Sequence, residues 1–190
     1  MRKQEDEAFS LGNYMPEHKT IGEQDRAKLI DWLCKLHYKF KMFPGTLFTM
    51  VSYIDRYLAV NNELPLSELQ LLGIAALFAA AKFEETYQVP PLKQLVTCCS
   101  YQYTAQQILQ KEADIIKILD FKLISNSVVR FFEPYSKIIG LELKNYHLAQ
   151  YILELSLIQP RFLKYQPSML AVSVIYLIKK IRKSESIWST

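Results

Sequence analysis

The chain has 190 residues, of which 50% are hydrophobic and 22% are charged, and its formal net charge is +4. This composition is typical of a folded protein with one large or two small domains, and it excludes a disordered or collagen-like chain. Five glycines provide no phosphate-binding loop, the three histidines are too scattered for a zinc site, and three cysteines without a signal peptide predict an intracellular location, in the nucleus or the cytoplasm. We therefore expect no metal and no cofactor.

The first two predicted helices follow one another closely. One opens near Arg26 and repeats apolar residues at helical spacing as far as Phe40. The second follows the Pro44-Gly45 pair, and Thr46 is its expected N-cap. Both helices are amphipathic, which predicts that they pack around a common core.

The third predicted helix, in the stretch 66–87, is the most apolar part of the chain. Ser67 and Gln70 have the spacing of a capping box, and every residue from 71 to 81 is apolar or glycine. Because no face is reserved for water, this helix is expected at the centre of a bundle. The run is shorter than the ~20 residues that span a membrane, and the charged cluster from Lys82 to Glu85 closes it. This junction suggests a binding site, although Lys82 alone would also suit a solvated helix end.

The remaining segments are also predicted to be helical. Pro90-Pro91 starts a short helix, and Thr104 with Gln107 forms a capping box for a helix that ends near Leu119. A linker around Ser125-Asn126 follows. Strand-like alternation is absent, so the predicted fold is all-α, with five helices and then an incomplete second repeat of three, near 127–139, 144–157 and 168–181. The last of these is expected to leave apolar surface uncovered.

Five motifs, in this order and at these separations, resemble the cyclin box, most closely that of the mitotic A and B types. They are R-x4-D-W-L, Y-I-D-R-Y-L, L-Q-L-L-G, A-x-K-F-E-E-x-Y and Y-T-x-x-Q-I-L-x-x-E. The resemblance implies an N-terminal helix or extension over 1–24, a first cyclin box over 25–123, and a shortened second repeat over 124–190. It also implies a non-catalytic regulatory subunit that binds and activates a cyclin-dependent kinase in mitotic control.

The resemblance assigns roles to three groups of residues. Arg26 and Asp55 correspond to a structural ion pair between two helices. Lys82 and Glu112 correspond to the charged residues that hold the kinase backbone. The whole kinase-binding set is Lys82, Phe83, Glu112, Ile116, Phe121 and Leu123.

A third group resembles a shallow patch that docks substrates or inhibitors bearing an Arg-x-Leu motif. Its members here are Leu29, Trp32, Lys35, Leu69 and Gln70. Lys35 replaces a glutamate that would pair with the arginine of the motif, so docking of that motif is expected to be weak or changed. Trp32 equally suits a core position in its helix.

The charge distribution leaves a second hypothesis open. Residues 1–120 carry 13 basic and 15 acidic side chains (net −2), and residues 121–190 carry 10 and 4 (net +6). A cyclin-fold adaptor could use this basic half, including Lys179, Lys180, Arg182 and Lys183, on nucleic acid or another protein without activating a kinase. The cluster is better explained by the dipole at a helix end, where cations are common, and nucleic acid is not the expected partner. No arrangement of catalytic residues suggests an enzyme.

Overall fold

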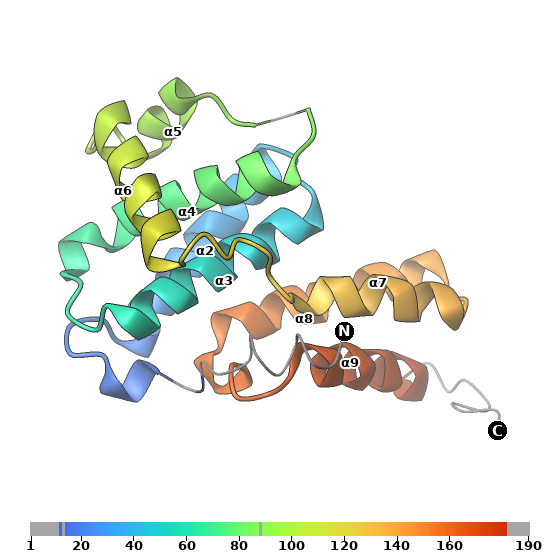
Figure 1. Cartoon of the computed structure of the whole chain (residues 1–190). Coiled ribbons are helices and arrows are strands. Elements are labelled where there is room, and N and C mark those ends of the chain that lie inside the picture. The colour runs from blue at the N-terminus through green and yellow to red at the C-terminus, as the bar shows by residue number, and fades with distance from the viewer. Residues whose placement is uncertain (1–11, 13, 88, 182–190) are drawn as a thin grey trace.

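The computed structural model describes residue 12 and residues 14–87 and 89–181, and within them the chain is helical without a strand. Five α-helices precede Asp120 and three follow it, which confirms the predicted all-α fold (Figure 1). The elements are η1 (Met15–Glu17), α2 (Glu23–Lys39), α3 (Pro44–Val60), η2 (Leu66–Glu68), α4 (Leu69–Glu84), α5 (Leu92–Cys98), α6 (Ala105–Ile118), α7 (Val128–Ile138), α8 (Leu143–Ile158), η3 (Pro160–Phe162) and α9 (Pro167–Ile181). Half of the expected N-terminal segment 1–24, namely residues 1–11 and 13, lies outside the described residues, as do Arg182 and Lys183.

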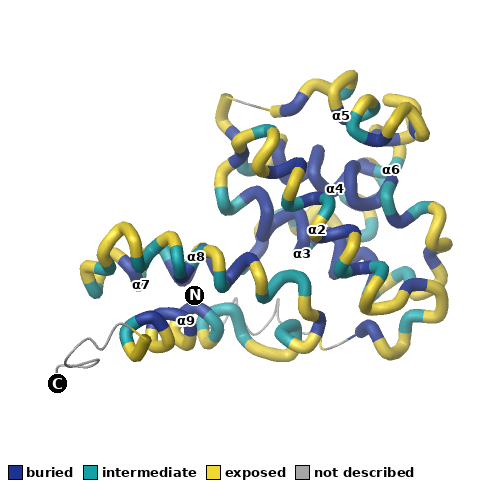
Figure 2. The backbone as a smooth tube through the Cα atoms, turned by 180° about the vertical axis from the view of Figure 1, so that it is seen from behind, coloured by how far each residue is buried: buried dark blue, intermediate teal, exposed yellow. Residues whose placement is uncertain are grey.

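Helix α4 is the centre of the first bundle, as its sequence predicts. Leu69 and every residue from 71 to 81 are buried, and α4 packs against α2, α3 and α6 (Figure 2). Each large side chain buried there contributes about 1.5–3 kcal/mol. A Cβ atom at Gly73 would lie 2.7 Å from Cδ1 of Leu29, so this glycine allows α2 to cross α4 at close range.

One helical stretch among the described residues, 66–84, is long and apolar enough by length and composition to cross a membrane. In this fold 67% of its most apolar window is buried inside the protein. The core helix of a globular bundle meets the same criteria, and α4 occupies such a position.

The three later helices form a second, smaller layer beside the first bundle (Figure 1). Helix α9 packs on α7 and α8, while α8 contacts α2 and α7 contacts α3. Only one side of α9 is covered, at Ala171, Val174, Ile175 and Ile178. Its other side exposes the apolar residues Met169, Val172, Tyr176, Leu177 and Ile181, in agreement with the expectation of uncovered surface on this helix.

Two predicted helix caps are wrong and one is confirmed. Pro44, which is well suited to a first helical turn, starts α3 two residues before Thr46, so Thr46 lies within the helix and is not its cap. Ser67 lies in the 3-10 turn η2, and α4 begins only at Leu69 without a side-chain cap. The Thr104–Gln107 capping box at the start of α6 is present, with the backbone N–H of Gln107 donating to Thr104 Oγ1 at 3.2 Å.

Candidate protein-binding site

The last turn of α4 and the middle of α6 bring Lys82 and Glu112 together at the surface of the first bundle. Lys82 Nζ lies 2.5 Å from Glu112 Oε1 and 4.6 Å from the ring centroid of Phe78. The Lys82 side chain is 45% exposed, whereas that of Glu112 is only 6% exposed. The two helices therefore hold a partly accessible ammonium over a nearly buried carboxylate.

Glu112 has one oxygen with an ion-pair partner but no well-aligned hydrogen bond within the described residues. Its buried Oε1 accepts no well-aligned hydrogen bond there, so the close approach of Lys82 is an ion pair with poor hydrogen-bond angles. Buried carboxylate oxygens are normally hydrogen-bonded. The partly exposed Lys82 ammonium can donate to a polypeptide backbone that covers the pair, and the buried Glu112 carboxylate can accept from that backbone once the lysine side chain moves aside.

The other four residues of the expected kinase-binding set are apolar and at least partly exposed. Phe83, the next residue on α4, is 41% exposed, and Phe121, just after α6, is 72% exposed. Ile116 and Leu123 are half-buried. Aromatic side chains around a small charged centre are the composition of a protein-binding surface, since the aromatics supply desolvation energy and the charges set the register.

The segment that carries Phe121 and Leu123 is held on α3 by residues to which the sequence analysis gives no role. Tyr53 Oη donates to the Leu123 carbonyl at 2.8 Å, and Arg56 Nη1 donates to the Lys122 carbonyl at 2.7 Å. Asp120 and Phe121 both have left-handed backbone conformations, with φ of 51° and 56°. Such conformations are costly for non-glycine residues and persist where the surrounding structure enforces them. Tyr53 and Arg56 are three residues apart in the Y-I-D-R motif and therefore lie on one face of α3. This spacing was the sequence signal from which their shared contact could have been predicted.

Comparison with known protein families agrees with this architecture. A family model described as the N-terminal domain of cyclins matches residues 1–124, and one for the C-terminal domain of cyclins matches residues 127–190. The chain is a member of the cyclin family. Among its relatives, cyclin-B2-2 of Oryza sativa subsp. indica is 38% identical over 86% of the chain, and the G2/mitotic-specific cyclin-B of Marthasterias glacialis is 35% identical over all of it.

The aligned part is under half of each of these relatives. The chain spans 39% of the length of the rice protein and 48% of that of the Marthasterias protein. Among solved structures, a viral cyclin from herpesvirus saimiri superposes with a TM-score of 0.77 at 18% identity, covering 88% of this chain and 74% of the viral one. A chain of the yeast RNA Pol II CTD kinase CTDK-1 complex gives 0.72 at 15% identity, covering 88% of this chain and 57% of that one. These likenesses show the cyclin fold.

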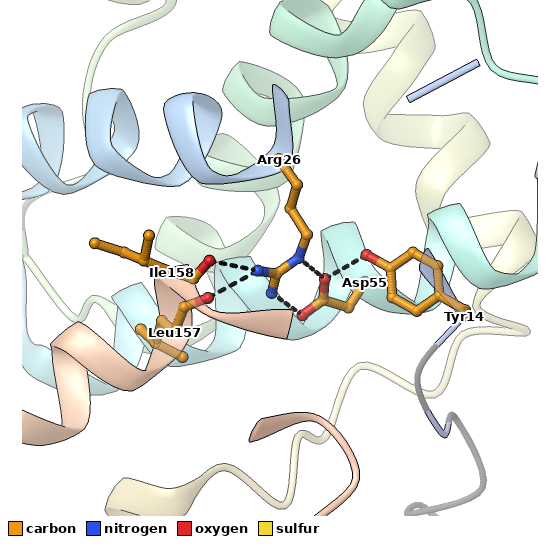
Figure 3. Close-up of polar contacts among 5 residues, drawn as sticks. All are labelled: Tyr14, Arg26, Asp55, Leu157 and Ile158. Atoms are coloured by element: carbon orange, nitrogen blue, oxygen red, sulfur yellow. Dashed lines mark hydrogen bonds and ion pairs between the residues drawn. The ribbon is translucent and has the colours of Figure 1, made fainter. Parts of the chain in front are cut away.

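The ion pair expected from the cyclin box is present and almost completely buried. Arg26 Nε and Nη2 donate to the two Asp55 oxygens at 2.7 and 2.8 Å, and the two side chains are 1% and 3% exposed (Figure 3). Tyr14 Oη, from beside η1, donates to Asp55 at 2.6 Å. Burial opposes the charge of Arg26, but the Asp55 carboxylate outweighs that effect and raises the Arg26 pKa. Burial and the charge of Asp55 raise the pKa of Tyr14.

Arg26 also reaches the second repeat. Its Nη1 donates to the carbonyl of Leu157 at 2.9 Å and to that of Ile158 at 3.4 Å, at the end of α8 (Figure 3). Carbonyls at a helix C-terminus lack intrahelical partners and favour a cation. One guanidinium thus connects α2, α3 and the second layer of this cyclin.

The five residues of the expected docking patch do not form an open apolar surface. Leu29 and Leu69 are core residues, 6% and 4% exposed. Trp32 and Gln70 are half-buried, and Trp32 packs against the core. Lys35 is exposed and its Nζ pairs with Asp31 Oδ2 at 2.6 Å. The exposed part of this region is therefore the outer surface of Trp32 among charged neighbours.

Glu84 and Glu85, which follow the apolar helix, turn toward local partners. Glu85 is buried and accepts from the Phe43 amide at 2.7 Å and from Thr46 Oγ1 at 2.6 Å. Glu84 accepts from Thr49 Oγ1 at 2.7 Å and faces Arg130 of α7 at 3.6 Å. The two carboxylates join the end of α4 to the start of α3 and to the second layer.

Proposed function

We propose that this cyclin is a regulatory subunit that binds and activates a cyclin-dependent protein kinase, and that it performs no chemistry itself. The proposal is supported by membership of the cyclin family and, above all, by the Lys82–Glu112 pair, whose buried carboxylate lacks a well-aligned hydrogen bond. A kinase that covered the pair would supply the missing backbone partner. The proposed contact set is Lys82, Phe83, Glu112, Ile116, Phe121 and Leu123.

In the proposed mechanism the cyclin changes a conformational equilibrium of the kinase. Its charged pair holds the backbone next to the regulatory helix of the kinase, and Phe83 and Phe121 cover apolar surface around that contact. The inward position of this helix lets its glutamate meet the strand lysine that orients the ATP phosphates. The active conformation is populated because the cyclin binds it more tightly than the inactive one.

We further propose a role in cell division, in the nucleus or the cytoplasm. Several relatives at about 35% identity are named G2/mitotic-specific cyclin-B, including those of Dictyostelium discoideum and Arbacia punctulata. Binding of Arg-x-Leu segments is expected to be weak, because Lys35 stands where an acidic residue would attract the arginine.

A charge-swapped variant tests the interface without breaking the intramolecular ion pair. Lys82→Glu with Glu112→Lys keeps opposite charges in contact but exchanges the donor and the acceptor offered to the kinase. Calorimetric titration into a purified monomeric cyclin-dependent kinase should give saturable binding for the wild type and roughly 100-fold weaker binding for the swap, the loss typical of two central contacts. Lys19→Glu with Glu63→Lys, an exposed pair at 2.5 Å, is the matched control and should bind normally.

Two outcomes would argue against the proposal. Equal affinity of the swapped and wild-type proteins would exclude the Lys82–Glu112 interface. Absence of binding by folded wild type to every kinase of this class would favour the cyclin-fold adaptor, which would bind nucleic acid or other proteins through its basic second half.

A further inference from the structure

The outward face of α2 carries a row of cations around one tryptophan. Lys28, Trp32, Lys35 and Lys39 are spaced by four, three and four residues, so they lie along a single face of the helix. The three lysines are exposed and Trp32 is half-buried. We call these four residues the basic face of α2.

Little acidic charge opposes this face. Asp31 pairs with Lys35 at 2.6 Å, but Lys28 has no ion pair among the described residues. Lys39 Nζ lies 3.5 Å from Cys98 Sγ of α5 and 5.8 Å from the centroid of the Phe40 ring, neither of which is an anion. The nearby Asp25 is used at the start of α2, where it accepts from the Gly22 amide at 3.1 Å.

The helices near this face do not neutralise it either, and the only acidic residue of α3, Asp55, is bound by Arg26 and Tyr14. Helix α5 contains no acidic residue, and the only one in α4 is Glu84, which is engaged by Thr49 and Arg130 at its far end. On the other flank, Glu154 of α8 is buried and accepts from Tyr38 and from Gln150. The basic face is therefore a region of positive charge around the half-buried Trp32.

We propose that the basic face of α2 docks an acidic segment of a partner protein, in which an apolar residue flanked by acidic residues contacts Trp32. Lys28 and Lys39 are eleven residues apart, which is about 16 Å along a helix, and an extended peptide covers that length with about five residues. Acidic residues at the two ends and near the middle of such a segment would meet the lysines, and the apolar residue between them would cover the indole.

Charge decides between the possible occupants. A segment rich in arginine would place like charges together, at a cost in affinity. Nucleic acid is less well matched, because the face offers a single aromatic residue and also carries Asp31. The docked segment would belong to a kinase substrate or inhibitor, and this last step rests on the proposed function; the binding itself does not.

Peptide binding to the cyclin alone tests the inference without a kinase. The probe is the fluorescein-labelled hexapeptide Glu-Ala-Leu-Glu-Ala-Glu, followed by fluorescence anisotropy, with two comparison peptides in which lysine replaces glutamate or alanine replaces leucine. We expect saturable binding of the acidic leucine peptide, weaker binding of the alanine peptide, no binding of the lysine peptide, and loss of affinity toward roughly 0.5 M salt, where charges beyond a few ångströms are screened.

Matched variants place the binding on α2. Lys28→Glu with Lys35→Glu should weaken the acidic peptide roughly tenfold, because two attractive contacts become repulsive. Lys137→Glu with Lys144→Glu makes the same change of charge at exposed positions of α7 and α8 and should leave the affinity within about twofold.

Each contrary result overturns the inference. Preference for the lysine peptide would show that the face accepts cationic segments. Equal weakening by the α2 and control variants would show attraction to overall charge only. Binding of a labelled DNA duplex that the α2 variant abolishes, with no binding of the acidic peptide, would assign the face to nucleic acid. In all three cases kinase activation would remain a separate question.

Discussion

Replacing Asp55 by alanine should be among the most damaging single changes outside the proposed kinase-binding surface. It removes the three hydrogen bonds that Asp55 accepts from Arg26 and Tyr14, at 2.6–2.8 Å, and leaves the guanidinium, 1% exposed, with only two backbone carbonyls. Stranding one partner of a buried ion pair costs about 3–5 kcal/mol. Domains of ordinary stability have only about 5–15 kcal/mol in total, so the Asp55→Ala protein is expected to be close to unfolding at 37 °C.

Urea unfolding followed by circular dichroism measures this cost, and a triple-mutant cycle separates the network of Arg26, Asp55 and Tyr14 from its surroundings. Arg26→Met, Asp55→Leu and Tyr14→Phe together leave no stranded charge and no unpaired hydroxyl. This triple variant should be more stable than Asp55→Ala, because apolar replacements of a buried pair are often nearly neutral. A loss below about 1 kcal/mol for Asp55→Ala, or strictly additive effects of the three changes, would refute the argument that the network is coupled.

Three further predictions concern stability and reactivity. Glu85→Ala leaves the Phe43 amide and the Thr46 hydroxyl without their acceptor and should cost about 1–3 kcal/mol in urea unfolding, while Glu17→Ala, at an exposed position, should stay within about 0.5 kcal/mol. In Gly73→Val the new Cβ atom would lie 2.7 Å from Leu29 Cδ1, so Leu29 must move, which should cost about 1–3 kcal/mol. An unchanged urea midpoint would show that α2 shifts without a loss of stability. Burial and nearby acidic charges raise the pKa of the Cys34 thiol to about 11, and burial raises the pKa of the Cys99 thiol to about 11. Iodoacetamide at about pH 8 should therefore label both thiols roughly 20-fold more slowly in the folded than in the unfolded protein. Mass spectrometry measures the two labelling rates. Equal labelling rates in the two states would contradict that assignment.

The helices themselves could be predicted because local signals determine them. Periodicity, the Pro90-Pro91 break and the Thr104–Gln107 box place α5 and α6 to within a residue or two. The unbroken apolar run 71–81 likewise predicts the burial of α4 on all sides. These signals arise from residues less than two turns apart, which a sequence displays directly.

Contacts between distant segments could not be predicted in the same way. Thr46 has the chemistry of a cap, but its hydroxyl is engaged by Glu85, which is 39 residues away. Arg26 was expected to join two helices, and its bonds to Leu157 and Ile158, more than 130 residues away, follow only from the packing of the second layer. Leu29 is in the core because Gly73 lets α2 approach α4 closely.

We propose that the surface around Lys82 and Glu112 activates a kinase. The most direct measurement is phosphate transfer by a purified, otherwise inactive cyclin-dependent kinase, titrated with this chain and with the Lys82→Glu, Glu112→Lys variant, both shown to be folded by circular dichroism. We expect saturable activation by the wild type and little or none by the variant at the same concentrations. Equal activation by both proteins, or none by the wild type with any kinase of this class, would contradict it.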